Sequence, residues 1–271
     1  MSPTARPKSK RVRLDQLLVE RGLVESRSRA QALVLAGKVR VGEGDAARRD
    51  LKPGDTIDPA TSVDVAAPEP YVSRGGHKLA AALDAFGIDP SGMTALDVGA
   101  STGGFTDVLL QRGARHVYAL DVGRGQLAER LRHDDRVTSM ERTNARTLTA
   151  STFSEPIDLA AIDVSFISLD KVLGPIATTL APRAPIVALV KPQFEAGKGR
   201  TDHGVVRDAA IHREVLERVT SRAATDHRLG TRAVMASPIF GPEGNREFLV
   251  HLAFGPSCAE LPERIAEAVA S

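Results

Sequence analysis

The chain has 271 residues, of which 42% are hydrophobic and 26% are charged, a balance typical of a folded globular protein and unlike that of a disordered one. It has no run of about 18 uncharged apolar residues, and its polar, basic start lacks the apolar segment of a secretory signal, so we expect a cytoplasmic protein. The single cysteine, Cys258, excludes an intrachain disulfide and a multi-cysteine zinc site, and no metal is predicted.

The net charge of +2 hides an uneven distribution. Within residues 1–42, ten lysines and arginines face three acidic residues, whereas 26 basic residues face 31 acidic ones in the rest of the chain. The beginning of the chain is therefore the part expected to bind a polyanion such as nucleic acid. Residues 1–10 belong to this basic stretch and are predicted to form a disordered tail.

Residues 11–67 are predicted to form a small α+β domain. Leucines recur at helical spacing over residues 14–23, and Ser26 is placed to cap a second helix that ends at Gly37. Segments typical of short β-strands follow at residues 38–41, 56–57 and 62–65.

The motifs of this domain resemble those of the S-four RNA-binding domain. They are Arg-Leu-Asp at 13–15, Leu-Val-Glu-Arg-Gly at 18–22, Ser-Arg-Ser-Arg-Ala-Gln at 26–31 and Gly-Lys-Val-Arg-Val at 37–41. The resemblance implies a surface that binds RNA phosphates and provides affinity rather than base recognition. From charge alone, a solvated basic face is the alternative. The candidate RNA-binding residues here are Arg11, Arg13, Arg27, Arg29, Lys38 and Arg40.

A proline-rich segment follows, and residues 68–73 are predicted to be an interdomain linker. In residues 74–271, near-continuous apolar strands alternate with helices, which is typical of a buried, mostly parallel sheet. The predicted fold class is therefore α/β and Rossmann-like. The expected strands are 95–98, 117–120, 159–162, 186–190, 232–235 and 248–252.

The first of these strands ends in Asp97-Val98-Gly99 and leads into a glycine-rich loop whose backbone can approach a ligand closely. The spacing Asp-x-Gly-x-x-x-Gly is not the Gly-x-Gly-x-x-Gly fingerprint of dinucleotide sites. It looks like the first motif of Rossmann-like methyltransferases, which bind S-adenosylmethionine. Asp121 ends the next strand, where a carboxylate can accept both ribose hydroxyls of an adenosine, although an NAD site would use the same acid.

Asn144, after the third strand, is a candidate adenine contact or a plain turn residue. The residues predicted to bind the cofactor are Asp97, Gly99, Ser101, Thr102, Gly103, Gly104, Phe105, Asp121, Asn144 and Asp163.

Two carboxylates and a lysine lie at the carboxyl edge of this sheet. Asp163 ends one strand, Lys191 follows the next, and Glu247 opens the last, while Lys78 lies on the helix before the first strand. Methyl transfer to a ribose hydroxyl needs a base. A positive charge on Lys78 would favour a neutral amine at Lys191, which the two carboxylates would aim. Taken singly, each residue is more simply explained as a surface charge or an ion-pair partner.

Five motifs occur in order along the chain: Ser-Arg-Gly-Gly-x-Lys-Leu at 73–79, the loop at 97–106, Ile-Asp-Val-Ser-Phe-Ile-Ser-Leu at 162–169, Lys-Pro-Gln-Phe-Glu at 191–195 and Gly-Pro-x-Gly-Asn-x-Glu at 241–247. This series closely resembles the TlyA-type family, in which an S-four domain precedes an FtsJ-like methyltransferase domain with a seven-stranded sheet and helices on both faces.

The resemblance implies 2'-O-methylation of cytidine in ribosomal RNA, with S-adenosylmethionine as the methyl donor. It also implies a catalytic tetrad of Lys78, Asp163, Lys191 and Glu247, with Lys191 as the general base. The nucleotide, the ribosomal subunit and the choice between naked RNA and assembled subunits stay open. The oligomeric state is also open, with a monomer favoured.

The linker departs from the family pattern, because some relatives carry Arg-x-Trp-Val where this chain has Glu69-Pro70-Tyr71-Val72. Coupling of RNA binding to cofactor binding through this segment is therefore in doubt. Residues 194–208 are glycine-rich and basic, and Lys198 and Arg200 could grip phosphates in a mobile lid or belong to a plain surface loop.

Two rival interpretations concern the function. The family has also carried the name haemolysin, but the sequence has neither a spanning helix nor a long amphipathic segment with aromatic anchors. An inactive RNA-binding scaffold is the other rival, and the presence of all four tetrad residues disfavours it.

Overall fold

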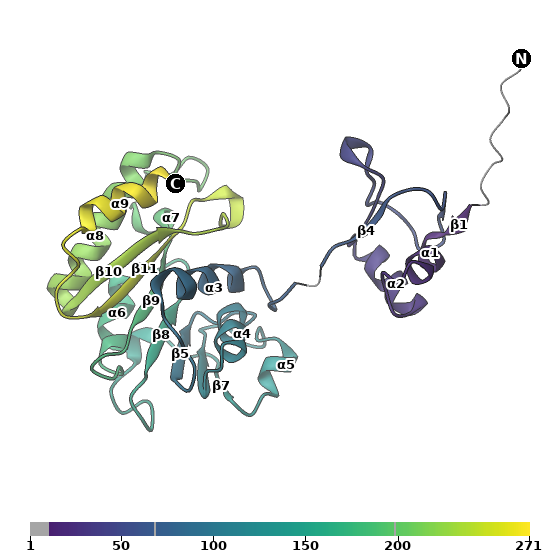
Figure 1. Ribbon diagram of the computed structural model, residues 1–271. Coiled ribbons are helices and arrows are strands. Elements are labelled where there is room, and N and C mark those ends of the chain that lie inside the picture. The colour runs from purple at the N-terminus through teal and green to yellow at the C-terminus, as the bar shows by residue number, and fades with distance from the viewer. Residues whose placement is uncertain (1–10, 68, 198) are drawn as a thin grey trace, which may run out of the picture. The chain divides into compact units, whose positions relative to one another are not determined.

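The computed structural model describes residues 11–67, 69–197 and 199–271 (Figure 1). The chain divides into two compact units at the Glu69–Pro70 bond. The tail predicted at residues 1–10 lies outside the described residues, as does Pro68 of the predicted linker.

The N-terminal unit combines two helices with two small antiparallel sheets in its described residues. Its elements are β1 (Val12–Arg13), α1 (Leu14–Glu20), α2 (Arg27–Leu35), β2 (Val39–Val41), the 3-10 helix η1 (Gly44–Ala46), β3 (Thr56–Ile57) and β4 (Val63–Val65). Strand β1 pairs with β3, and β2 pairs with β4. The predicted α+β arrangement is confirmed, and Ser26 caps α2 because its hydroxyl accepts a hydrogen bond from the Arg29 N–H at 3.2 Å.

The Asp15 side chain of α1 accepts hydrogen bonds from three polar side chains of this unit. Its fully buried carboxylate accepts hydrogen bonds from Arg13 at 2.9 and 3.0 Å, from Arg27 at 3.2 Å and from Gln31 at 2.9 Å. These donors, above all Arg13, hold the pKa of Asp15 well below its ordinary value. Because a buried carboxylate without partners is strongly destabilising, Arg13 and Arg27 have a structural role in this unit.

The second unit is built on a seven-stranded sheet with the order β7-β6-β5-β8-β9-β11-β10. The five strands from β7 to β9 are parallel, and β11 runs antiparallel to both of its neighbours. The strands are β5 (Thr94–Val98), β6 (His116–Leu120), β7 (Val137–Met140), β8 (Leu159–Ile162), β9 (Ile186–Val190), β10 (Leu229–Ala236) and β11 (Phe248–Phe254). The predicted mostly parallel α/β fold is confirmed.

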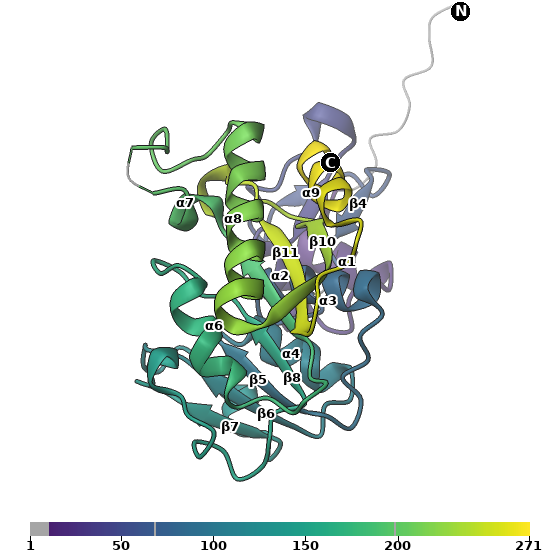
Figure 2. The same cartoon turned by 90° about the vertical axis from the view of Figure 1, so that its left-hand side faces the viewer.

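Helices cover both faces of this sheet (Figures 1 and 2). One face carries α3 (Gly75–Phe86), α4 (Gly104–Gln111) and α5 (Glu129–Arg132). The other carries α6 (Asp170–Ala177), α8 (Ala209–His227) and α9 (Leu261–Ala270). Three short helical turns, η2 (Ala145–Thr147), α7 (Pro192–Glu195) and η3 (Pro242–Gly244), lie in the loops at the carboxyl edge of the parallel strands.

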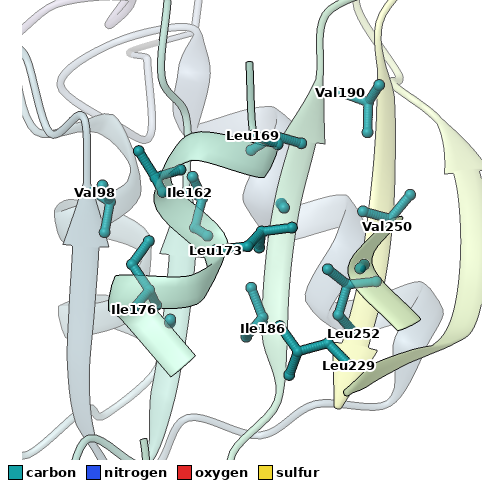
Figure 3. Close-up of a cluster of buried hydrophobic side chains, with 14 of the residues drawn as sticks. Val98, Ile162, Leu169, Leu173, Ile176, Ile186, Val190, Leu229, Val250 and Leu252 are labelled. Atoms are coloured by element: carbon teal, nitrogen blue, oxygen red, sulfur yellow. The ribbon is translucent and has the colours of Figure 1, made fainter. Parts of the chain in front are cut away.

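Apolar side chains from alternate strand positions fill the layer on each face. In the layer of Figure 3, Leu173 and Ile176 of α6 lie over Val98, Ile162 and Ile186 of three neighbouring strands. All five side chains are almost completely buried, and each contributes roughly 1.5–3 kcal/mol to folding. This packing fixes the strand ends from which the loops of the carboxyl edge depart.

Residues 70–72 of the predicted linker contact the rest of the second unit through hydrogen bonds and a ring contact. The Val72 N–H donates to Asp107 Oδ2 on α4 at 2.8 Å, and Gln111 donates to the Pro70 carbonyl at 2.8 Å. The Tyr71 ring meets the His77 ring edge to face, with centroids 5.4 Å apart. Residues 70–73 therefore pack as part of the second unit, although the tetrapeptide at residues 69–72 departs from the family pattern.

Asp97 joins strand β5 to the first turn of α4. Its carboxylate is fully buried, and Oδ2 accepts hydrogen bonds from the Thr106 N–H at 2.8 Å and from the Thr106 hydroxyl at 2.6 Å. Oδ1 has no hydrogen-bond partner among the described residues. Burial raises the pKa of Asp97 to about 7, and the nearby charges of Asp163 and Asp121 act in the same direction.

We expect Asp97 to make the free energy of unfolding fall as the pH rises from about 4 to about 7. In this range the folded protein holds a proton on Asp97 that the unfolded chain, with an ordinary carboxyl pKa, has released. The slope is at most about 1.4 kcal/mol per pH unit. The side chain of the Asp97→Asn variant cannot titrate. The difference in free energy of unfolding between wild type and this variant should therefore decrease as the pH rises from about 5 to about 8. Urea denaturation at each pH measures this difference.

Asp84→Asn is the matched control. Hydrogen bonds from Arg112 lower the pKa of Asp84, so this carboxyl is ionised in both states over the same range and its profile should be flat. A flat profile for Asp97→Asn, or one that rises with pH, would contradict the assignment.

Candidate active site

The loops at the carboxyl edge of the sheet enclose three neighbouring cavities, called A, B and C here, of about 480, 500 and 430 Å³. Cavity A lies among the loops that follow β5, β6, β7 and β8, the third of which contains η2. Cavity B lies between the glycine-rich loop, α3 and residues 239–242. Cavity C lies between residues 165–166, α7 and residues 201–204. Asp163 lines both A and B, while Lys191 and Glu247 line both B and C.

The glycine-rich loop is shaped by close packing against three other segments. A Cβ added to Gly99, which has a φ of +86°, would lie 2.4 Å from the Asp163 carbonyl oxygen. A Cβ at Gly103 would lie 2.3 Å from the Leu131 side chain, and one at Gly104 would lie 2.2 Å from the Ser73 hydroxyl. Real atoms do not approach so closely. Gly99 meets backbone and, like Gly103 with a φ of +95°, has a positive φ, so these two positions require glycine, whereas a side chain at Gly104 would have to displace the Ser73 hydroxyl.

Two polar residues predicted to hold an adenosine border cavity A. Asp121 Oδ2 accepts a hydrogen bond from the Ser101 N–H at 2.8 Å, and Oδ1 accepts one from the Gly123 N–H at 2.7 Å. Asn144 Oδ1 accepts a hydrogen bond from the Arg146 N–H at 3.0 Å and so caps η2. Asn144 therefore has the turn role and also a place in the cavity wall.

Most of the residues predicted to bind the cofactor lie at these cavities. Those that line cavity A are Gly99, Ser101, Asp121, Asn144 and Asp163, and those that line cavity B are Gly99, Ser101, Thr102, Gly104, Phe105 and Asp163. Asp97 and Gly103 line neither cavity. Asp97 is buried behind the loop, bound to Thr106, and Gly103 faces Leu127 and Leu131.

The structure brings the four tetrad residues together in the wall of cavity B as two ion pairs. Lys78 Nζ lies 2.5 Å from Glu247 Oε2, and Lys191 Nζ lies 2.5 Å from Asp163 Oδ1. Both lysine side chains and that of Glu247 are almost completely buried, and Asp163 is 22% exposed.

Each lysine of the tetrad thus faces a carboxylate. Lys191 Nζ also donates a hydrogen bond to the Ser165 hydroxyl at 2.8 Å. A lysine bound in this way must lose a proton before it can act as a base. The direct influence of Lys78 on Lys191 stays a prediction.

Several residues of the cavity walls were not predicted from the sequence. Phe166 is 89% exposed and has a φ of +63°, an unfavourable backbone conformation for a phenylalanine. The signal that could have found Ser165 and Phe166 is their place directly after Asp163 at a strand end. Other wall residues without a predicted role are Gln126, Arg146, Gln193, Phe194, Phe240 and Asn245.

The segment predicted to be a lid forms one wall of cavity C through Thr201 and Gly204. Buried Asn245 holds it, because its amide donates to the Gly204 carbonyl at 3.0 Å and accepts from the Val206 N–H at 3.1 Å. Arg200 forms two hydrogen bonds with Glu214 of α8, at 2.6 and 2.7 Å. The other candidate phosphate ligand, Lys198, lies outside the described residues.

The candidate RNA-binding residues of the N-terminal unit fall into two groups. Four of them bind other residues of the unit. Arg13 and Arg27 bind Asp15. Arg11 donates to the Thr56 carbonyl at 2.6 and 3.1 Å, and Arg40 lies 3.2 Å from Asp64. Arg29 and Lys38 are exposed and form no ion pair with any described residue.

The described residues show neither a metal-binding cluster nor a membrane-spanning helix. No group of three or more histidine, cysteine, aspartate or glutamate side chains there could hold a metal ion. No helix in that part of the chain has both the length and the apolar character needed to cross a bilayer.

Comparisons with known proteins match both units. Residues 71–254 match the FtsJ-like methyltransferase family, and residues 12–44 match the S4 domain, the S-four domain named above. The 16S/23S rRNA (cytidine-2'-O)-methyltransferase TlyA of Mycobacterium tuberculosis is 47% identical over 249 residues, which cover 90% of each chain. Hemolysin A of Brachyspira hyodysenteriae is 41% identical over 89% of this chain and 99% of its own.

A solved structure of a hemolysin-like protein from Streptococcus thermophilus has a TM-score of 0.72 and 44% identity, and the match covers 95% of each chain. The chain therefore belongs to the FtsJ-like methyltransferases, as a TlyA-type member with an N-terminal S4 domain.

Proposed function

We propose that this protein transfers a methyl group from S-adenosylmethionine to the 2'-hydroxyl of a cytidine in ribosomal RNA. The observation that carries the proposal is the meeting of Lys78, Asp163, Lys191 and Glu247 in the wall of the cavity that contains the glycine-rich loop. The S4 domain and the activity named for the Mycobacterium tuberculosis relative support RNA as the acceptor.

We assign S-adenosylmethionine to cavities A and B together, where it would supply an electrophilic methyl group. Gly99 borders both cavities and leaves no room for a side chain, so the loop backbone can lie directly against a ligand. Asp121 keeps unused lone pairs on both oxygens, which suits the two ribose hydroxyls of the nucleoside. We place the nucleoside in cavity A and the amino-acid part beside Thr102 and Gly104 in cavity B.

We assign the acceptor nucleotide to cavity C. This cavity shares Lys191 and Glu247 with cavity B but has no residue of the glycine-rich loop. A ribose at the boundary of the two cavities would therefore have its hydroxyl beside the tetrad. Glu247 Oε1 is buried beside Gly241 and has no hydrogen-bond partner among the described residues, so Lys191 is the tetrad residue that we assign to that hydroxyl.

Lys191 is the base in this scheme. A deprotonated lysine amine keeps two N–H donors and gains one lone pair, and Asp163 and Ser165 are placed to receive the two donors. The lone pair is then left for the proton of the 2'-hydroxyl. After the proton has moved, Asp163 stabilises the resulting ammonium. Lys78 neutralises Glu247 and holds it in place as a positioning residue.

We expect Lys191→Met to lower the rate of methyl transfer at least about 100-fold, because the general base is lost. Ribosomal subunits from a strain without this protein, incubated with tritiated S-adenosylmethionine, provide the measurement. Resistance of the labelled linkage to alkali identifies the 2'-oxygen as the acceptor. Affinity for S-adenosylmethionine, measured by calorimetry, should stay within a few-fold of wild type.

Lys171→Met is the control, since Lys171 is an exposed lysine of α6 outside the three cavities. Wild-type rates in Lys191→Met would reject the base assignment, and failure of wild type to label any RNA would reject the function. Lysis of red cells by the purified protein would support the rival haemolysin interpretation.

For the N-terminal unit, we expect Arg29→Gln with Lys38→Gln to weaken RNA binding and flatten its salt dependence. Each lost phosphate contact should reduce the slope of log K against log salt by about 0.7 to 0.9. Filter binding over a salt series measures this slope. Lys52→Gln, another exposed lysine of the same unit, is the control. An unchanged slope in the double variant would refute the surface that we assign.

A further inference from the structure

Phe240 presents an aromatic ring at cavity B. It lies in the loop between β10 and β11, is 54% exposed, and lines the cavity that contains the tetrad. A single exposed apolar side chain is common on proteins and means little by itself. The contacts around this ring, however, indicate a specific binding role.

One neighbour of the ring is a cation. The Arg246 guanidinium carbon lies 5.3 Å from the centre of the Phe240 ring, within the range of a cation–π contact. The ring is therefore held beside a positive charge while it also borders cavity B.

The loop that carries Phe240 is braced on both sides of the ring. Before it, the Ser237 hydroxyl donates to the Ile239 carbonyl at 2.7 Å. After it, the Gly241 N–H donates to the Asn245 carbonyl at 2.9 Å, and a Cβ on Gly241 would lie 2.3 Å from Glu247 Oε1. The position of the ring is thus tied to that of a tetrad carboxylate.

We propose that Phe240 stacks on the RNA base next to the methylated nucleotide and that Arg246 neutralises a phosphate of the same strand. Aromatic rings stack on unpaired bases of RNA, and arginine supplies the charge that a phosphate requires. The ring is 54% exposed, and Pro242, two residues further along the same loop, lines both cavity B and cavity C. The exposed part of the ring therefore lies near the cavity assigned to the acceptor nucleotide, where it can meet the next base of the strand. This inference rests on the proposed function.

The test compares Phe240→Ala, Phe240→Leu and Phe240→Tyr by steady-state kinetics on the ribosomal subunits described above. Loss of one stacked base should raise KM for the subunits about tenfold in the alanine and leucine variants, while KM for S-adenosylmethionine stays unchanged. The tyrosine variant keeps an aromatic face and should restore KM. Arg246→Gln should lower the salt slope of subunit binding by about 0.7 to 0.9, whereas Arg246→Lys should keep it.

Two results would overturn the proposal. A wild-type KM for the subunits in the leucine variant would mean that any apolar side chain can replace the ring, so that no base stacks on it. A rise in KM for S-adenosylmethionine that matches the rise for the subunits would mean that the ring covers the methyl donor. If wild type transfers no methyl group, the proposed function fails, and subunit binding in the presence of S-adenosylhomocysteine still decides whether Phe240 contacts RNA.

Discussion

The buried ion pair between Lys78 and Glu247 joins the first helix of the methyltransferase unit to the start of its last strand, 169 residues later in the chain. Neither charge is tolerated alone in such a place, since removal of one partner of a buried pair costs roughly 3–5 kcal/mol. Both side chains line cavity B, and Glu247 also lines cavity C. The contact that ties α3 to the start of β11 therefore also forms part of the wall of cavity B, so stability and the proposed chemistry depend on the same two residues.

The meeting of the tetrad could be predicted because it follows from topology. Apolar runs such as residues 159–162 and 186–190 can be buried only in a sheet covered on both faces, and parallel strands place Asp163 and Lys191 at one edge. Glu247 reaches this edge from the opposite direction, because β11 is antiparallel and begins where its neighbour ends. Short elements of the N-terminal unit were found equally well, since the cap at Ser26 and the turn at Gly37 fix them locally.

Side-chain pairing could not be predicted in this way. Charge counting treats each arginine as free, whereas Arg27 binds Asp15 across two helices and Arg200 binds Glu214 of α8. A motif likewise does not tell which of its residues face the ligand. Asp97 belongs to the glycine-rich loop motif, yet its carboxylate is used inside the fold by Thr106. Such distinctions depend on side-chain directions and distances of a few ångströms between elements far apart in sequence.

The three glycines of the loop also limit how this site can be redesigned. Gly99, Gly103 and Gly104 already have the smallest possible side chain, and each is confined by a different neighbouring segment. Extra room for a bulkier alkyl donor therefore cannot come from these three positions. It has to come from larger side chains elsewhere in the walls, such as Val122 and Ile167 of cavity A or Ile239 of cavity B. For the cofactor placement that we propose, engineering of donor tolerance begins at those positions.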